Sequence, residues 1–474
     1  MSLVAAALFL AVSPASLAVE PGLQAPFQLR SGEYRIPEPV ATPEWVTRLA
    51  NSRGVPDCDL VGNPNTFDYV VRLTTWPGLV PDRIVYIDAS APFGGDGSSW
   101  TNAYQSLHDA LNAESFSTEL VDIRIATGFY RADRVGGMDT LDPELTFQLP
   151  GITVTDGVPT GVMRVAGGFA GRNARNPDAR DLDLYPTVFT GDLFGNDTES
   201  YENYEDNTKV MFEPGLTELN GITIEHARVA VNELRWMTDC TVRWCFASGD
   251  DLPLVRDDRS PVLAREARIV GNTFHNNRAE AYGGALAPRG LIVVANSRFL
   301  RNTAMAGGAI GVRFGAAGQI IAQNCYFAAN SADGAFGGVG GAIYNSNSGS
   351  RSTRIVHCTF VGNWAQDGGG HGAVGGNASA NIQNSIFDQN YSYAGTGFDS
   401  EIMLGAHSSY ADTVRASVFA RYNENAVSPP QPFRFRLNIG ADPAFRNLLG
   451  EDGVLGTLDD DPSLSTQSPA IGRS

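Results

Sequence analysis

The second half of the chain repeats one pattern of apolar and polar positions. Each unit has a phenylalanine followed three residues later by an asparagine, and successive units are 25 to 33 residues apart. The five pairs are Phe274/Asn277, Phe299/Asn302, Phe327/Asn330, Phe360/Asn363 and Phe387/Asn390. Residues 283–286, 307–310 and 340–343 read Gly-Gly-Ala followed by Leu or Ile. A unit this short cannot bury its apolar face alone, so the repeat predicts a stack of similar coils.

Stacking predicts where the repeated residues lie. If adjacent coils pair as parallel strands ~4.8 Å apart, each phenylalanine packs on the next one inside the solenoid. Cys325 and Cys358 stand two residues before a phenylalanine and share its inward face. We expect them to be stacked free thiols rather than a disulfide. The asparagines are expected at corners, in the left-handed conformation and bonded to the next coil.

Two kinds of solenoid end a strand in an asparagine ladder. A leucine-rich repeat does so, but it needs regular leucines and often a helix on its far side. Here the far side is Gly-Gly-Ala-Ile with inserts of variable length, which suits strands and loops. We therefore predict an all-β fold, a right-handed parallel β-helix.

The stretch before the repeats predicts the beginning of the solenoid. Residues 84–88 and 121–126 have the composition of strands, with a glycine-rich turn at 94–97. Between them, apolar residues fall at helical spacing over residues 104–113. A helix at this point would cover the open first edge of the solenoid. The domain boundaries follow: an irregular module over residues 19–82, and the β-helix with its cap and acidic C-terminal end over residues 83–474.

The first 18 residues predict export. The apolar run from Leu3 to Val12 is too short to span a bilayer, and Ser16 to Ala18 have the small residues of a signal-peptide cleavage site. The run lacks the usual lysine or arginine before it. No later segment has 18 consecutive apolar residues, so no transmembrane segment is expected. The predicted location is secreted or on the cell surface.

Composition and charge limit the classes of molecule that the protein is expected to bind. With 43% hydrophobic and 18% charged residues the chain can form a core, and its 52 glycines indicate many turns. The net charge of −18 argues against nucleic acid, because phosphate binding needs a basic surface. Lys209 is the only lysine, and we interpret it as a surface charge. Five cysteines are too few for a disulfide scaffold. The pattern does not define an oligomeric state.

The repeats resemble those of the polymorphic outer-membrane protein family, whose passenger regions are right-handed parallel β-helices. The residues that carry this resemblance are the five F-x-x-N units and the interleaved GGAL and GGAI. Residues 84–130, GGFAG at 167–171, TGDLFGND at 190–197 and the final DPSLSTQSPAIG are similar to exported bacterial β-helix proteins of the pectin-lyase-like superfamily. Relatives include adhesins and polysaccharide lyases, so the resemblance implies a fold rather than one activity.

Candidate chemistry is confined to two acidic segments. Sugar-cleaving β-helices need carboxylates, or calcium-binding acids with a basic residue, on one outer face. By composition the best catalytic candidates are Asp250, Asp251, Arg256, Asp257 and Asp258. GDD at 249–251 and GHG at 370–372 are similar to polygalacturonase motifs, but Asp250 and His371 lie several coils apart and the other motifs are absent. We interpret residues 250–259 as a solvated loop.

The second acidic segment lies near the C-terminus. Asp452, Asp459, Asp460 and Asp461 could offer oxygen ligands to Ca²⁺ on glycine-rich loops, although their spacing does not fit an EF-hand.

These observations favour a non-catalytic binding, adhesion or structural role, directed towards a polysaccharide or cell-envelope glycan. The alternative is a polysaccharide lyase or glycoside hydrolase that acts on an acidic polysaccharide. A stacked aromatic row on one outer face would favour binding, whereas convergent aspartates and arginines on adjacent coils would favour catalysis.

Overall fold

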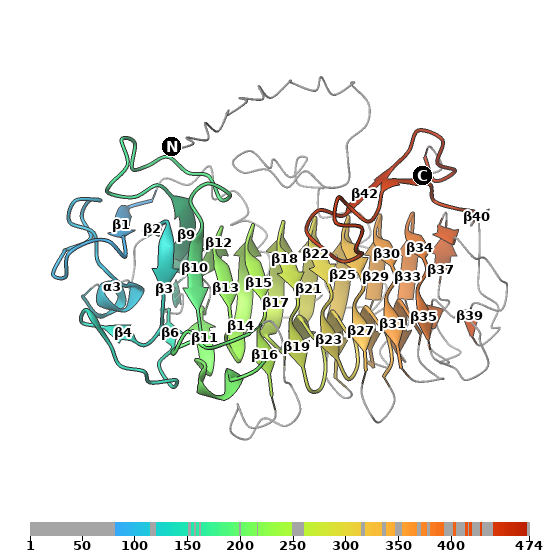
Figure 1. Ribbon diagram of the computed structural model, residues 1–474, viewed down its shortest axis with the longest axis horizontal. Coiled ribbons are helices and arrows are strands. Elements are labelled where there is room, and N and C mark those ends of the chain that lie inside the picture. Colours follow the sequence, from blue (N-terminus) through green and yellow to red (C-terminus); the bar gives the residue numbers. More distant parts are fainter. Residues whose placement is uncertain are drawn as a thin grey trace, which may run out of the picture.

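The computed structural model shows a parallel β-helix whose coils stack along one axis (Figure 1). It describes residues 81–113, 120–149, 153–155, 158–160, 163–198, 201–215, 217–248, 260–313, 318–333, 338–346, 353–366, 371–376, 380–392, 402–403, 413–415, 417–419, 427–428 and 439–471. The predicted signal peptide, residues 19–80 of the predicted N-terminal module, and Cys58 lie outside the described residues.

Three parallel sheets form the sides of the solenoid. A typical coil contributes β25 (Gln319–Gln323) to the first sheet, β26 (Tyr326–Ala328) to the second and β27 (Ser331–Ala332) to the third. It then returns to the first sheet through β28 (Ile343–Asn345). The strand after each Gly-Gly-Ala therefore begins at the aliphatic residue, as the repeat predicts.

The first sheet has 19 described strands. They are β1 (Arg83–Ile87), β2 (Val121–Ala126), β6 (Phe147–Gln148), β9 (Met163–Phe169), β11 (Val210–Glu213), β12 (Glu218–Asn220), β14 (Val229–Thr238), β17 (Val262–Val270), β20 (Leu286–Pro288), β21 (Leu291–Ala295), β24 (Ile310–Val312), β25, β28, β29 (Thr353–Val356), β32 (Val374–Gly376), β33 (Ala380–Gln383), β36 (Ile402–Met403), β37 (Thr413–Arg415) and β39 (Val427–Ser428).

The second and third sheets have 11 and six described strands. The second contains β3 (Gly128–Tyr130), β10 (Thr187–Thr190), β13 (Thr223–Glu225), β15 (Thr241–Arg243), β18 (Thr273–His275), β22 (Arg298–Leu300), β26, β30 (Thr359–Val361), β34 (Ile386–Asp388), β38 (Val418–Phe419) and β40 (Ile439–Gly440). The third contains β16 (Phe246–Ala247), β19 (Arg278–Ala279), β23 (Thr303–Ala304), β27, β31 (Trp364–Ala365) and β35 (Tyr391–Ser392).

Three short antiparallel pairs lie outside these sheets. They are β4 (Arg134–Val135) with β5 (Met138–Asp139), β7 (Thr153–Thr155) with β8 (Val158–Thr160), and β41 (Phe445–Asn447) with β42 (Asp461–Leu464).

The repeated phenylalanines stack inside successive coils, as predicted. Phe274, Phe299, Phe327, Phe360 and Phe387 are fully buried, and neighbouring ring centroids lie 4.7 to 4.9 Å apart with interplanar angles of 2° to 7°. The spacing is that of adjacent parallel strands, so the one-to-one register of the second sheet sets the stack.

The asparagine ladder is confirmed, but its backbone conformation differs from the prediction. Asn302 donates its amide to Asn330 Oδ1 at 3.0 Å, and Asn330 donates to Asn363 Oδ1 at 2.9 Å. The left-handed residue is the one before each asparagine, for example Arg301 and Ala329. That residue turns the chain, so the asparagine can point its side chain inward and bond to the coils on both sides.

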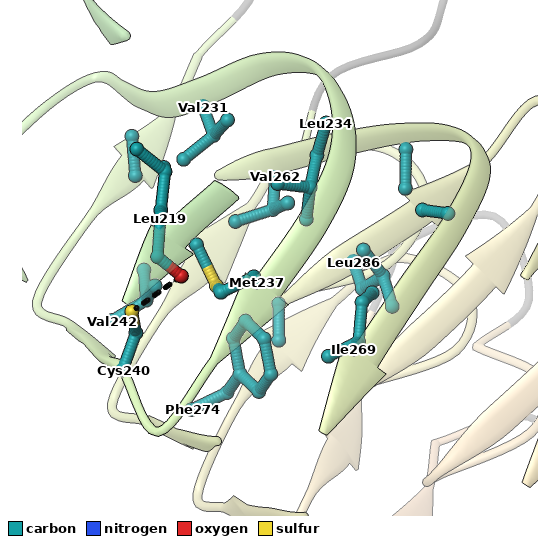
Figure 2. Packing of buried hydrophobic residues seen from close by; sticks show 14 of the residues in the cluster. Leu219, Val231, Leu234, Met237, Cys240, Val242, Val262, Ile269, Phe274 and Leu286 are labelled. Carbon is teal, nitrogen blue, oxygen red and sulfur yellow. Dashed lines mark hydrogen bonds between the residues drawn. The ribbon is translucent and has the colours of Figure 1, made fainter. Parts of the chain in front are cut away.

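A second inward column runs two residues before the phenylalanines. Cys325 and Cys358 belong to it as buried free thiols, as expected. In an earlier coil, Cys240 Sγ donates to Leu219 O at 3.4 Å beside Phe274 (Figure 2). Other coils have small residues in this column, for example Ser297 and Ser385, and these are buried as well.

The N-terminal end of the solenoid is capped by α3 (Leu107–Ala113) (Figure 1). Its Leu107 and Ala110 are fully buried. The helix begins three residues later than its apolar spacing predicts because Ser106 caps it, with Oγ accepting the Asp109 N–H at 3.1 Å. In the part of the chain that the structure describes, no helix is long and apolar enough to cross a membrane.

The C-terminal segment 441–471 docks on the outside of the second sheet. Arg298 on β22 donates to the carbonyl groups of Thr457, Leu458 and Asp460. The Tyr326 hydroxyl donates to Asp460 Oδ2 at 3.0 Å. Apolar contacts from Phe445, Leu448 and Leu455 complete this docking.

Candidate functional site

The outer surface of the third sheet carries one side chain from each of five coils in register. We call these residues the outer row: Arg278, Thr303, Ser331, Trp364 and Tyr391. The alternate residues of the same strands point inward, four of them buried alanines, so the outer row faces away from the core. At ~4.8 Å per coil the row spans roughly 19 Å.

The outer row combines aromatic, hydroxyl and cationic groups on an open surface. Tyr391 is 47% exposed, Arg278 is exposed, and Trp364 is half-buried. The hydroxyl groups of Thr303 and Ser331 lie 2.9 Å apart. An aromatic ring offers an apolar face, and the hydroxyls and guanidinium offer hydrogen bonds. This mixture suits a polyhydroxylated ligand that runs along the solenoid.

A second aromatic pair lies outside the core where the chain returns to the first sheet. Tyr282 and Tyr344 stack with ring centroids 6.0 Å apart and an interplanar angle of 22°. Tyr344 faces outward between Gly311 and Gly375 of the neighbouring strands. Tyr344 is half-buried there, and the backbone at Gly283 and Gly340 lies close to these two glycines.

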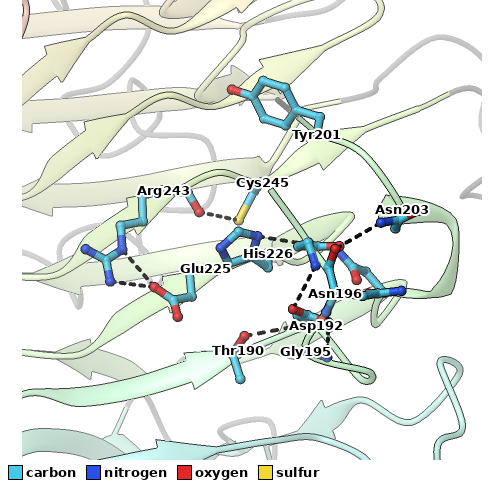
Figure 3. A network of polar contacts seen from close by, with 12 residues as sticks. Thr190, Asp192, Gly195, Asn196, Tyr201, Asn203, Glu225, His226, Arg243 and Cys245 are labelled. Carbon is cyan, nitrogen blue, oxygen red and sulfur yellow. Dashed lines mark hydrogen bonds and ion pairs between the residues drawn. The ribbon is translucent and has the colours of Figure 1, made fainter. Parts of the chain in front are cut away.

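Polar side chains cluster on the second sheet at β13 and β15 (Figure 3). Arg243 donates from Nε and Nη2 to Glu225 Oε2 at 2.8 and 2.6 Å, and its guanidinium lies 4.4 Å from the Trp244 ring. Trp244 also stacks on His226 at 5.4 Å. The faces of Trp244 are therefore already covered by protein groups, which makes it a poor platform for a sugar.

The loop after β10 lies against this cluster (Figure 3). Asp192 Oδ1 accepts the backbone N–H groups of Phe194, Gly195 and Asn196. Asp197 Oδ2 lies 2.9 Å from His226 Nδ1. The carboxylates of Asp192, Asp197 and Asp206 offer oxygen atoms that all lie within 4.8 Å of one another, and among the described residues this is the one group of three that could hold a metal ion.

Acidic and basic residues also converge on adjacent coils of the first sheet. Asp122, Arg164 and Glu218 stand in register on β2, β9 and β12. Asp122 pairs with Arg164 at 2.8 Å and with Arg124 at 3.0 Å. Glu218 is only 2% exposed, and its Oε1 accepts the Asn220 amide at 2.9 Å.

A loop over residues 170–185 closes this network. Arg180 from that loop donates to Gly167 O and to Asn220 Oδ1. Because the carboxylates are buried beneath protein groups, a polysaccharide cannot reach them in this conformation. We therefore interpret the network as structural.

Glu218 gives the network a pH dependence. Burial raises its pKa to about 7 from an ordinary value of 4.5, despite the opposing effects of the Asn220 hydrogen bond and Arg164. A carboxyl group with a raised pKa stabilises the fold below pH 4.5, and this stability is lost as the pH rises through 7. Between pH 4.5 and pH 8 this group should lower the free energy of unfolding of the original protein by up to about 3 kcal/mol, and Glu218→Gln should not show that loss.

Thermal melting of both proteins at pH 5 and pH 8 checks this expectation. The melting temperature of Glu218→Gln relative to the original protein should rise at pH 8, while Glu144→Gln, at a residue 64% exposed, should change little. Parallel pH dependence of the original protein and Glu218→Gln would refute it.

The structure places some of the residues predicted from the sequence. The catalytic candidates Asp250, Asp251, Arg256, Asp257 and Asp258 lie outside the described residues. His371 is buried, and burial lowers its pKa to about 4. Lys209 pairs with Glu144.

The C-terminal aspartates act as hydrogen-bond acceptors within their own segment. Asp459 accepts the Glu451 and Asp452 N–H groups and the Thr457 hydroxyl, and these bonds lower its pKa to about 2. Asp460 accepts a hydrogen bond from the Tyr326 hydroxyl, while Asp452 and Asp461 each accept one from a nearby backbone N–H. No three of these carboxylates form a metal-binding group in the described part of the chain. Calcium binding by this segment stays a prediction.

Comparisons with known proteins give similarities of architecture. No family model and no curated protein matches the chain. Among solved structures, pectate lyase Pel9A is similar at 16% identity and a TM-score of 0.41, over 83% of this chain and 91% of that chain. A rhamnogalacturonan lyase is similar at 10% identity and a TM-score of 0.37, over 81% of this chain and 97% of that chain. The three parallel sheets of this chain themselves make it a right-handed parallel β-helix. The resemblance to polymorphic outer-membrane repeats stays a prediction.

Proposed function

We propose that this protein is an exported, non-catalytic β-helix protein that binds a glycan along the outer row of its third sheet. The observation that carries the proposal is the in-register series Arg278, Thr303, Ser331, Trp364 and Tyr391 on five successive coils. A regular polymer presents similar groups at intervals, and the solenoid presents binding groups at a regular ~4.8 Å spacing. The apolar segment at residues 3–12 and the cleavage pattern at 16–18 support export.

Retention on immobilised polysaccharides tests the proposal. A panel of acidic and neutral polysaccharides is run with and without Ca²⁺, while unsaturated sugar products are followed by ultraviolet absorbance. We expect at least one polymer to retain the protein without product. Loss of one aromatic contact of about 1 kcal/mol weakens binding ~5-fold, so the double variant Trp364→Ala/Tyr391→Ala should weaken it ~25-fold. Phe129→Ala, which removes an exposed ring from the second sheet, is the matched control.

A polysaccharide lyase or hydrolase is the second candidate, because acidic and basic residues do converge on adjacent coils at Asp122, Arg164 and Glu218. Their burial is the argument against it. Formation of unsaturated or reducing sugar products would favour catalysis over the binding proposal. Failure of every polymer to bind, or equal retention of the double variant, would refute the outer row as a glycan surface.

A further inference from the structure

The loop between β10 and β11 encloses oxygen atoms that have no hydrogen-bond partner. Asp197 Oδ1, Asp206 Oδ1 and Asn207 Oδ1 are each buried and accept no hydrogen bond from any described residue. The side chain of Asp197 is only 3% exposed, and Asn207 is only 2% exposed. A buried oxygen without a partner is destabilising by about 1 to 3 kcal/mol, so three of them in one loop call for a ligand.

These oxygens lie at one place. The carboxylates of Asp192, Asp197 and Asp206 come within 4.8 Å of one another. Asn207 Nδ2 donates to Asp197 Oδ2 at 2.6 Å, which holds the planar amide of Asn207, with its free oxygen, against the same carboxylates. Ca²⁺ binds oxygen at 2.3 to 2.6 Å, so ligands on opposite sides of the ion are up to roughly 5 Å apart. The cluster already has that size.

Hydrogen bonds within the loop fix the positions of the three carboxylates. Asp192 is fixed by four backbone N–H groups, those of residues 194 to 197. Asn196 Nδ2 donates to Asp206 Oδ2 at 3.0 Å, and His226 Nδ1 lies beside Asp197 Oδ2. Each of these contacts fixes a carboxylate through one oxygen and leaves the partner oxygen of Asp197 and Asp206 unused.

We propose that this loop binds one Ca²⁺ ion through Asp192, Asp197, Asp206 and Asn207. The donors are carboxylate and amide oxygens, which suit a hard cation. Ca²⁺ tolerates an irregular arrangement of loop ligands, whereas Mg²⁺ requires near-ideal octahedral geometry. The ion joins residues at both ends of the loop and ties the loop, through Asp197 and His226, to the second sheet. This site is distinct from the C-terminal aspartates and does not depend on the proposed glycan binding.

Terbium luminescence and thermal melting of the full chain test the site. Trp244 stacks on His226, which contacts Asp197, so excitation of the indole should sensitise Tb³⁺ bound in the loop. We expect one Tb³⁺ to bind, Ca²⁺ to displace it, and Mg²⁺ at equal concentration to displace it poorly. CaCl₂ should raise the melting temperature, and EDTA should reverse the rise.

Two variants and a control locate the ion. Asp206→Asn and Asp197→Asn should each weaken Ca²⁺ affinity by at least ~10-fold. Asp452→Asn, in the C-terminal acidic segment, should leave affinity unchanged. Among the described residues, Asp206 accepts one side-chain hydrogen bond, from Asn196, so its variant keeps the test valid if Asp197→Asn fails to fold. The site is refuted if the original protein binds no Ca²⁺, or if Asp206→Asn binds it as tightly as the original protein does.

Discussion

Replacement of Phe327 by alanine is expected to destabilise the protein by about 4 kcal/mol, within the range measured when a buried phenylalanine is truncated. Phe327 is fully buried, and its ring lies 4.8 Å from the Phe299 ring and 4.7 Å from the Phe360 ring. Truncation opens a cavity in the middle of the stack. Backbone pairing on both sides holds the neighbouring rings at the strand spacing, so they cannot collapse into that cavity.

Urea unfolding followed by near-ultraviolet circular dichroism measures this loss. The midpoint for Phe327→Ala should move to a clearly lower urea concentration. Phe129→Ala is the matched control, since it removes the same ring from a position that is 70% exposed, and its midpoint should stay close to the original. Equal midpoints for the two variants would show that the stacked phenylalanines do not stabilise the solenoid.

The repeat frame made most of the C-terminal coils predictable. Once Phe299 and Phe327 are taken as inward neighbours, a one-to-one parallel register places the cysteines, the asparagine ladder and the first residue of the following strand. The repeat did not predict which residue adopts the left-handed backbone conformation. The left-handed residue varies between Arg301, Ala329 and Gly362, so no single residue type marks it in the sequence.

The earlier coils could not be aligned by the same signal. Their inward positions on the second sheet are Ile224 and Val242, which continue the column of Phe274 without an aromatic ring. Cys245 takes the position of a ladder asparagine, and its backbone N–H donates to Asn277 Oδ1 at 3.2 Å. The earlier coils therefore have the same backbone arrangement, although they lack the phenylalanine and asparagine that mark the repeat in the sequence.

The outer row was within reach of sequence reasoning but was missed. Its members Thr303, Ser331, Trp364 and Tyr391 each follow a ladder asparagine directly, so the repeat frame already aligns them. Period-two alternation in a strand then requires them to face outward when the next residue faces inward. The signal was the residue type immediately after each asparagine.

The acidic loop after β10 was harder to predict. Asp192, Asp197 and Asp206 follow no period, and their convergence depends on how the loop turns back on itself. The segment TGDLFGND contributed only to a resemblance, because sequence spacing does not show which carboxylate oxygens lack a partner. The buried oxygens of Asp197 and Asn207 became visible only with the side-chain geometry.

Loss of the Asn330 side chain is expected to destabilise the protein by roughly 4 kcal/mol or more. Asn330 Oδ1 accepts the Asn302 N–H and side-chain amide, each at 3.0 Å. Its amide donates to Phe299 O and Asn363 Oδ1, each at 2.9 Å. Asn330→Ala would take one buried hydrogen bond from each of these four groups. Asn363 Oδ1 keeps the bond from the backbone N–H of residue 330, and the Asn302 amide keeps its bond to Phe274 O. The full cost of about 1 to 3 kcal/mol each before relaxation therefore falls on the Asn302 N–H and on Phe299 O.

Asn330→Asp distinguishes the acceptor role of the Asn330 side chain from its donor role. The carboxylate retains both acceptor roles but turns an oxygen towards Phe299 O and Asn363 Oδ1, where only a donor is tolerated. Burial favours the protonated acid, which can donate one bond, so the folded-state pKa of the new carboxyl should be raised. Its stability is then present below the unfolded pKa of about 4 and is lost as the pH rises.

Urea unfolding should therefore show that Asn330→Asp is much less stable relative to Asn330→Ala at pH 8 than at pH 4. The loss of stability of Asn330→Ala against the original protein should be similar at the two pH values. Asn381→Ala is the control, because Asn381 faces outward on the first sheet and accepts a single bond from Gln383 Nε2. Its effect should stay within about 0.5 kcal/mol. If Asn330→Ala lies as close to the original protein as this control, the ladder follows the coil without stabilising it, and the stacked phenylalanines alone hold the register.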